Sequence, residues 1–142
     1  MGKTNWKRVF LGGLVAGVVL IILGFVSVNL YLKNLWDPAV AALNPAFEDT
    51  TGFQLFWIAF YLVTGFIAVW LYSAIRPRYG AGPKTAVIAG LVVWILCPLS
   101  FSAISGSFGL FPAGLLVPDS LTTLVQYVVA TLAGVWVYKE QE

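Results

Sequence analysis

Histidine is absent from the 142 residues of this chain, and cysteine and methionine occur once each. Without imidazole there is no histidine ligand for haem or chlorophyll, or for the zinc and copper ions that histidine usually holds. The single cysteine, Cys97, excludes an intrachain disulfide and a dithiol redox centre. The sequence therefore predicts a protein with no bound metal and no cofactor.

Charged side chains are missing from four long segments, 9–32, 50–75, 85–118 and 120–138, and all eight basic and six acidic residues lie outside them. A membrane-spanning helix needs about 20 apolar residues. The chain is 60% hydrophobic, with a mean hydropathy of +0.90. We therefore predict an all-α membrane protein, a compact up-down bundle of four transmembrane helices in a single domain, with the helices at about 6–31, 51–75, 85–104 and 120–138.

The same segments hold no carboxylate that could carry a proton across the membrane, which argues against transport coupled to a buried acidic residue. There is also no Ser-His-Asp arrangement, phosphate-binding glycine loop or metallohydrolase pattern. We therefore expect that the protein is not an enzyme.

One set of acidic residues lies in the two connections that carry few basic residues. If gathered at the membrane surface, these carboxylates could bind a divalent cation or a cationic substrate, or serve a lipid-directed enzyme. The simpler interpretation is that two of them cap helices and two favour the positive end of the second helix. The four residues are Asp37, Glu48, Asp49 and Asp119.

Basic residues are distributed unequally between the two sides of the predicted domain. Only Lys33 lies in the first or third connection. Because cytoplasmic segments of membrane proteins carry the excess of Lys and Arg, we expect both termini to be cytoplasmic. The net charge of +2 is too small to suggest a nucleic-acid partner. The other seven basic residues are Lys3, Lys7, Arg8, Arg76, Arg78, Lys84 and Lys139.

Prolines are expected to shape the ends and middles of the helices. Asp37 and Pro38 predict the cap and first turn of a short surface helix. Pro98 lacks an N–H, so it should release the carbonyl of Trp94 and kink the third helix. Residues 105–118 are expected in the headgroup zone or dipping into the outer leaflet, with Asp119 capping the fourth helix.

An internal repeat relates the two halves of the chain. Lys7 with Gly13-Leu14-Val15 recurs as Lys84 with Gly90-Leu91-Val92, and the segment 68–72 (AVWLY) recurs as 134–138 (GVWVY). The repeat predicts two helical hairpins in tandem, related by an axis along the membrane normal. Chance similarity between apolar helices is the alternative.

Small residues recur on single helix faces and predict close helix packing. On the first helix they are spaced four and three residues apart, and Gly13 and Gly17 form the small-xxx-small pattern of membrane helix pairs. Two interpretations remain open: an interface with another subunit or copy, or packing within the four-helix bundle. The candidate packing face consists of Gly13, Gly17, Gly24, Ala86, Gly90, Ala130 and Gly134.

Five polar or aromatic residues lie near the middle of the predicted helices, away from the interfaces where Trp and Tyr gather. Converging polar tips inside an apolar bundle could line a ligand pocket. The alternative is that these groups bond to one another and hold the helices together. The five are Tyr61, Thr64, Trp94, Gln126 and Tyr127.

Several stretches resemble small bacterial four-helix membrane proteins with no assigned activity: 5–9 (NWKRV), 11–17 (LGGLVAG), 84–94 (KTAVIAGLVVW), 109–112 (GLFP) and 130–134 (ATLAG). The resemblance implies a bacterial origin and four spans, and no activity. We predict a non-enzymatic multi-pass protein of the bacterial cytoplasmic (inner) membrane. It would be an accessory or scaffold subunit acting through helix packing, in contact with lipid and with other membrane subunits or further copies of itself. The alternative is a small transporter or channel for an apolar or uncharged solute.

Overall fold

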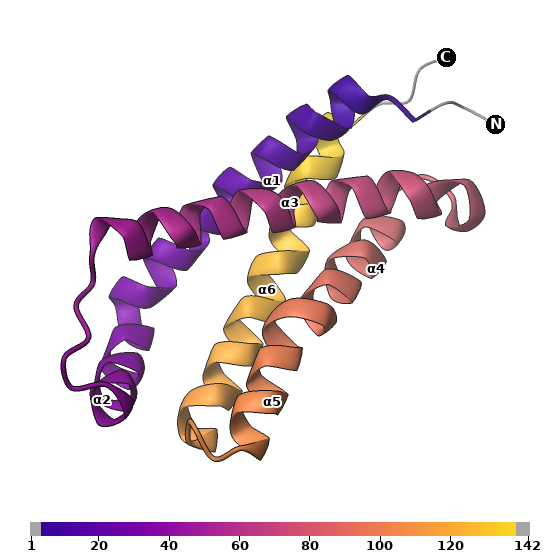
Figure 1. The fold of residues 1–142 in the computed structure, drawn as a ribbon. Helices are drawn as coiled ribbons and strands as arrows, with labels where there is room; N and C mark the ends of the chain where they lie inside the picture. Colours follow the sequence, from indigo (N-terminus) through magenta and orange to yellow (C-terminus); the bar gives the residue numbers. More distant parts are fainter. Residues whose placement is uncertain (1–3, 139–142) are drawn as a thin grey trace.

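The computed structural model describes residues 4–138, which form helices and short connections without a strand. Lys3 and Lys139, which contribute to the predicted charge bias, lie outside the described residues. The elements are α1 (Trp6–Ser27), a π-helical turn η1 (Val28–Leu32), α2 (Lys33–Leu43), α3 (Thr51–Tyr79), α4 (Pro83–Trp94), a second π turn η2 (Ile95–Leu99), α5 (Ser100–Ser107) and α6 (Ala113–Val137), as shown in Figure 1.

Neither π turn interrupts the helix that contains it, so the described chain forms four long helices: Trp6–Leu43, Thr51–Tyr79, Pro83–Ser107 and Ala113–Val137. Each is long and apolar enough to cross a membrane. The prediction of an all-α protein with four helices of membrane-spanning length is confirmed.

The four long helices pack against one another in up-down order. α1 packs on α3 and α6, α4 packs on the same two helices, and α3 also touches α6. The loops 44–50 and 108–112 lie at one end, which we call the distal end, and the turn 80–82 lies at the other end near both termini (Figure 1). Towards its N-terminus, α3 diverges from α5 and α6 (Figure 1).

Local sequence explains where two of the helices begin. The Asn5 side chain accepts the N–H of Arg8 at 3.2 Å, and the Thr50 hydroxyl accepts the N–H of Phe53 at 3.3 Å. Each therefore serves one of the N–H groups that a helix start leaves without a partner. Asn and Thr are among the residues most often found at this position.

The second long helix ends later than predicted. It was expected to stop near Ile75, but α3 continues through Pro77 to Tyr79, where Gly80 ends it with a φ of 83°. A proline one turn from a helix end removes only one hydrogen bond. The hydroxyl of Thr85 donates to the carbonyl of Gly80 at 2.7 Å, which serves an otherwise open group of the turn.

The predicted caps at the distal end are wrong. The first helix continues through η1 and α2 to Leu43, so Asp37 and Pro38 lie inside it. α6 begins at Ala113, so Asp119 also lies inside a helix rather than at its start, and residues 113–118 are helical rather than irregular.

The irregularity predicted at Pro98 takes the form of η2. A π turn contains one residue more than an α-helical turn, so later N–H groups take over from the one that proline lacks. The N–H of Ser100 reaches the Ile95 carbonyl, and its hydroxyl donates to the same oxygen at 2.7 Å.

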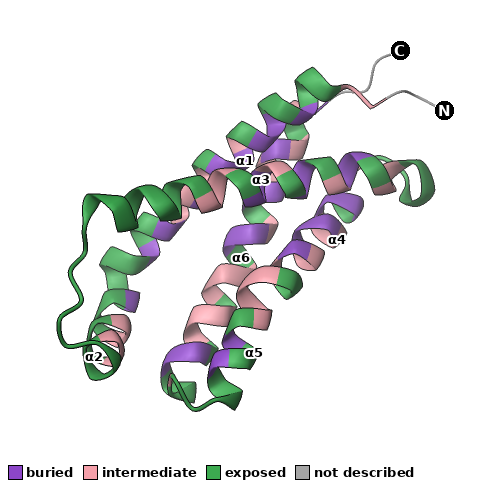
Figure 2. Ribbon diagram, in the orientation of Figure 1, coloured by how far each residue is buried: buried purple, intermediate pink, exposed green. Residues whose placement is uncertain are grey.

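Buried residues gather where the long helices cross, as Figure 2 shows. One cluster includes Val9, Val69, Tyr72 and Ala86, near the end that carries the termini. A second cluster in the middle of the bundle includes Leu20, Val93 and Tyr127. By contrast, every residue from 51 to 59 at the start of α3 is exposed.

Candidate functional site: polar and small-residue contacts between helices

The small residues of the first helix lie against α3. A Cβ added to Gly13 would come within 2.7 Å of the Cα of Phe66, and one added to Gly17 within 2.8 Å of the Cα of Leu62. A Cβ on Gly24 would meet the Tyr61 hydroxyl at 2.9 Å. These glycines therefore allow α3 to approach more closely than any side chain would permit.

The small residues of α4 and α6 are used in the same way. A Cβ on Gly90 would lie 2.9 Å from the Thr131 hydroxyl, and one on Gly134 would lie 2.5 Å from the carbonyl oxygen of Gly12. Ala86 and Ala130 are buried as well. The structure thus places all seven residues of the candidate packing face against the chain's own helices.

Sequence reasoning missed two partners in this packing, Gly12 and Gly65. A Cβ on Gly65 would lie 2.4 Å from the backbone nitrogen of Gly17. Gly12 does form a small-xxx-small pair with Ala16, so the sequence carried a signal for it. Gly65 has no small residue four positions away on α3, and its contact with Gly17 across the helix pair identifies it.

Four of the five mid-helix residues lie around the central cluster. The Tyr127 hydroxyl donates to the Thr64 hydroxyl at 3.3 Å, and Tyr61 and Trp94 pack against the same cluster. The indole N–H of Trp94 bonds to α6, at 3.1 Å from the Ser120 carbonyl and 3.2 Å from the Thr123 hydroxyl.

Gln126 faces α1 instead. Its amide nitrogen donates to the Ser27 hydroxyl at 2.8 Å and to the Leu23 carbonyl at 3.3 Å. Its amide oxygen is buried and has no hydrogen-bond partner among the described residues. The structure therefore does not bring Gln126 together with the other four side chains.

In four contacts that join two helices, a Ser or Thr hydroxyl faces a polar group of the neighbouring helix. A hydroxyl has one proton and two lone pairs. Here the proton is donated back to a carbonyl of the hydroxyl's own helix, so the oxygen is left to accept from the neighbouring helix. The donating hydroxyls are Ser27 to Gly24, Thr64 to Phe60, Thr122 to Pro118 and Thr123 to Asp119. The groups they accept from are on Gln126, Tyr127, Tyr31 and Trp94, respectively.

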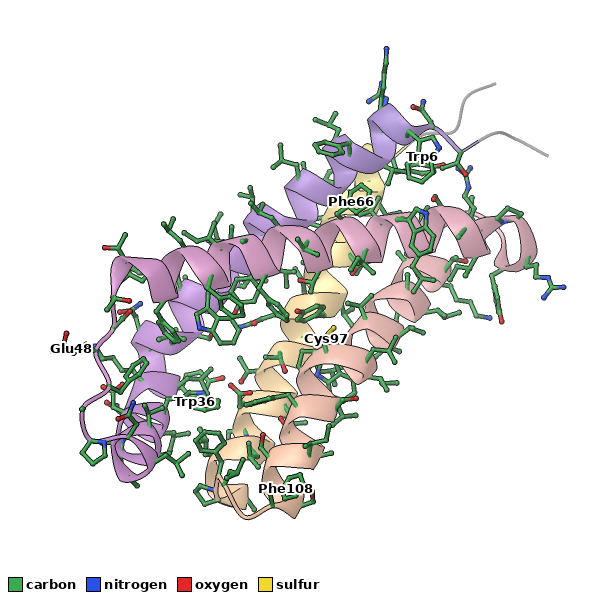
Figure 3. The ribbon with its side chains drawn as sticks, in the orientation of Figure 1. Trp6, Trp36, Glu48, Phe66, Cys97 and Phe108 are labelled. Carbon is green, nitrogen blue, oxygen red and sulfur yellow. The ribbon has the colours of Figure 1, made fainter. Side chains whose placement is uncertain are left out.

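Two of these contacts, together with the contact between Trp36 and Asp119, follow one another from the middle of the bundle to the distal end, and we call the three the α1–α6 ladder. Its rungs are Gln126 with Ser27, Tyr31 with Thr122, and the indole N–H of Trp36 with a carboxylate oxygen of Asp119 at 3.1 Å. Figure 3 shows Trp36 projecting from α2 into the space between α2 and α6.

The π turn η1 sets the register of the ladder. On α6 the rungs are four and three residues apart, which keeps them on one helix face. On the first helix the spacing is four and then five residues, from Ser27 to Tyr31 to Trp36. Five residues would turn an α-helix well past the facing helix, and the extra residue in η1 turns Trp36 back towards α6.

Asp119 is half-buried at the last rung. The ring of Trp36 also packs edge to face on Phe111, with centroids 5.1 Å apart. The four acidic residues considered earlier do not gather, because no group of three potential metal ligands exists in the described part of the chain.

A hollow of about 460 Å³ lies between α4, α5 and α6. Its walls include Leu99, Ala103 and Leu116, with the Ser102 and Ser120 hydroxyls 3.0 Å apart. Of the five mid-helix residues, Trp94 alone lines it.

Together, the four long apolar helices and their internal glycine and hydroxyl contacts define a multi-pass α-helical membrane protein. Comparison with protein-family models, with curated proteins and with solved structures finds no match for this chain. Its function must therefore be argued from its own residues.

Proposed function

We propose that this chain is a non-enzymatic accessory or scaffold subunit of a bacterial cytoplasmic membrane, and that it holds another membrane subunit through the exposed start of α3. We call residues 51–59 the α3 arm. The observation that carries the proposal is that every residue of the arm is exposed. Nine residues make more than two helical turns, so the bundle covers no face of this segment.

The arm is already ordered for contact. Phe53 and Trp57 pack edge to face with centroids 6.2 Å apart, and Phe56 and Trp57 do so at 5.7 Å. Aromatic side chains that support one another lose little conformational freedom on binding, which favours association. Phe47 extends the row from the preceding loop, 5.1 Å from Phe53.

A protein partner suits the arm better than lipid alone. Gln54 is exposed in the middle of the aromatic row, and its side chain has no recorded hydrogen bond within residues 4–138. An amide on a membrane helix gains about 0.6 to 2 kcal/mol from a hydrogen bond to a neighbouring helix. Lipid tails offer no such bond.

The glycine faces support the same assignment by elimination. Gly13, Gly17 and Gly90 are in contact with the chain's own helices, so they are not free to receive a second subunit. The contacts made by these glycines do not involve the α3 arm, and all nine residues of the arm stay exposed.

The transporter alternative has less support. A pathway around Tyr61, Trp94, Gln126 and Tyr127 would need those polar groups to face a common space. Instead Trp94 and Tyr127 donate to neighbouring helices and Gln126 faces α1.

The test is purification of the full chain in a mild detergent with its associated subunit. The variant Phe56→Ala with Trp57→Ala should lose the associated protein, while Leu121→Ala, at an equally exposed position on α6, should keep it. Recovery of the wild-type chain alone, or equal retention by both variants, would contradict the proposal.

The proposed orientation places both termini in the cytoplasm, on the evidence of the charge bias. In a Cys97→Ala background, a membrane-impermeant maleimide applied from outside should label a cysteine at Phe47 and spare one at Tyr79. The reverse pattern would invert the topology.

A further inference from the structure

Asp119 carries a carboxylate inside one of the four long helices, a feature the sequence had suggested was absent. It lies six residues after the start of α6, which places it about 9 Å along the helix. Its side chain is half-buried and faces α2, where it accepts the indole N–H of Trp36.

The contact with Trp36 does not require a charge. An Asn side chain of the same shape would accept the indole N–H equally well, without the cost of placing a carboxylate in a membrane helix. Lys33 lies three residues before Trp36 on the same long helix, yet it forms no ion pair with Asp119. That lysine therefore does not neutralise the carboxylate.

The neighbouring groups on the ladder also lack donors. The hydroxyl protons of Thr122 and Ser27 go to carbonyls of their own helices, which leaves each oxygen to accept from a neighbour. Two turns along α6 from Asp119, the buried amide oxygen of Gln126 has no donor, in a residue that is 4% exposed. The groups along this face with unused hydrogen-bonding capacity are therefore acceptors. A molecule that brings N–H donors would satisfy them.

Aromatic rings adjoin the indole that bonds to Asp119. The ring of Trp36 packs on Phe111, and the ring centroids of Phe111 and Phe101 are 6.3 Å apart. An organic ammonium combines N–H donors, which suit a carboxylate, with an apolar body, which suits aromatic rings. Divalent metal ions instead need about six oxygen ligands, and the described residues provide no group of acidic side chains that could supply them.

We propose that Asp119, Trp36 and Phe111 form a binding site for a protonated organic amine, with the ammonium group on the carboxylate and the apolar part of the molecule against the rings. This site lies between α2 and α6 and shares no residue with the α3 arm, so variants of the two can be tested separately. Failure of one proposal therefore leaves the other standing.

The experiment uses the full chain in nanodiscs of zwitterionic lipid, with 2-phenylethylammonium as the probe and equilibrium dialysis as the measurement. Empty nanodiscs correct for partition into lipid. Asp119→Asn keeps an oxygen for Trp36 and should weaken binding by about tenfold or more. Glu48→Gln removes an exposed carboxylate from the loop and should bind like the wild type.

Propylbenzene, a neutral molecule of the same shape as the probe, separates charge recognition from apolar binding. It should bind wild type and Asp119→Asn equally. Phe111→Ala supplies a second variant that leaves the ladder intact, and it should also weaken probe binding while circular dichroism remains unchanged. Wild-type binding no greater than that of empty nanodiscs, or equal binding of the probe by wild type and Asp119→Asn, would overturn the proposal.

Discussion

The rings of Tyr72 and Tyr138 meet edge to face, with their centroids 5.9 Å apart. The two tyrosines hold the same place in the repeated segments 68–72 and 134–138. Residues that a two-fold axis relates can touch each other only close to that axis. The contact is therefore what a tandem repeat of hairpins predicts for its even helices, α3 and α6.

The odd helices follow the same arrangement. Gly13 and Gly90 hold equivalent places in the repeat, and each packs on the even helix of its own hairpin, Gly13 on Phe66 and Gly90 on Thr131. The even segments are offset by 66 residues (134 minus 68), so the strict equivalent of Phe66 is residue 132. Thr131 lies one residue before that position. The structure supports the repeat to within one residue at this contact.

The first prediction concerns the crossing of α1 and α3. Gly17→Ala should reduce the free energy of unfolding by about 1–3 kcal/mol, because the new Cβ meets backbone that cannot move aside. Gly114→Ala is the matched control, since nothing lies within 4 Å of its new Cβ. Thermal unfolding in detergent measures both, and equal stability of the two variants would contradict the packing described here.

Much of this fold could be predicted from sequence, since uncharged segments and caps at Asn5 and Thr50 depend on local chemistry. The distal helix ends could not. Local rules favour a helix start at Asp37-Pro38 and at Asp119, but both positions lie inside longer helices, where Trp36 and Asp119 meet across two helices. The ladder did leave a signal, because Asp119, Thr122 and Gln126 are polar residues spaced three and four apart on one face of α6.

The candidate site was predictable in composition but not in geometry. Tyr127 and Thr64 come together as bonded partners, whereas Gln126, the next residue to Tyr127, points to a different helix. Adjacent positions on a helix are about 100° apart, so similar depth does not imply a shared space. Only the positions of the neighbouring helices decide which polar groups meet.

A second prediction tests whether the hydroxyl contacts hold the bundle together. Thr64→Val and Tyr127→Phe each remove one member of the pair that is 3.3 Å apart. In a double-mutant cycle the two changes should be coupled by about 0.6 kcal/mol, the usual value for membrane helices. Strict additivity in the unfolding free energies would show that the bond contributes nothing.

A third prediction follows from the extra residue in η1. Deleting Leu30, which is 72% exposed, should convert η1 to α-helix and leave position 36 facing α6, because the π turn absorbs one extra residue. The readout is crosslinking between cysteines placed at Trp36 and Asp119 in a Cys97→Ala background, using a short bifunctional reagent. Crosslinking should be as efficient after the deletion as at full length; a sharp fall after the deletion would refute the assigned register.

The central claim is that the bundle uses its small residues internally and leaves the α3 arm for another protein. Photo-crosslinking in intact membranes tests it most directly, with the reactive side chain placed at Phe56 or at Leu121, which are 61% and 59% exposed. The account predicts a discrete protein adduct from Phe56 and lipid adducts alone from Leu121. Lipid adducts alone at both positions, or the same protein adduct from both, would contradict it.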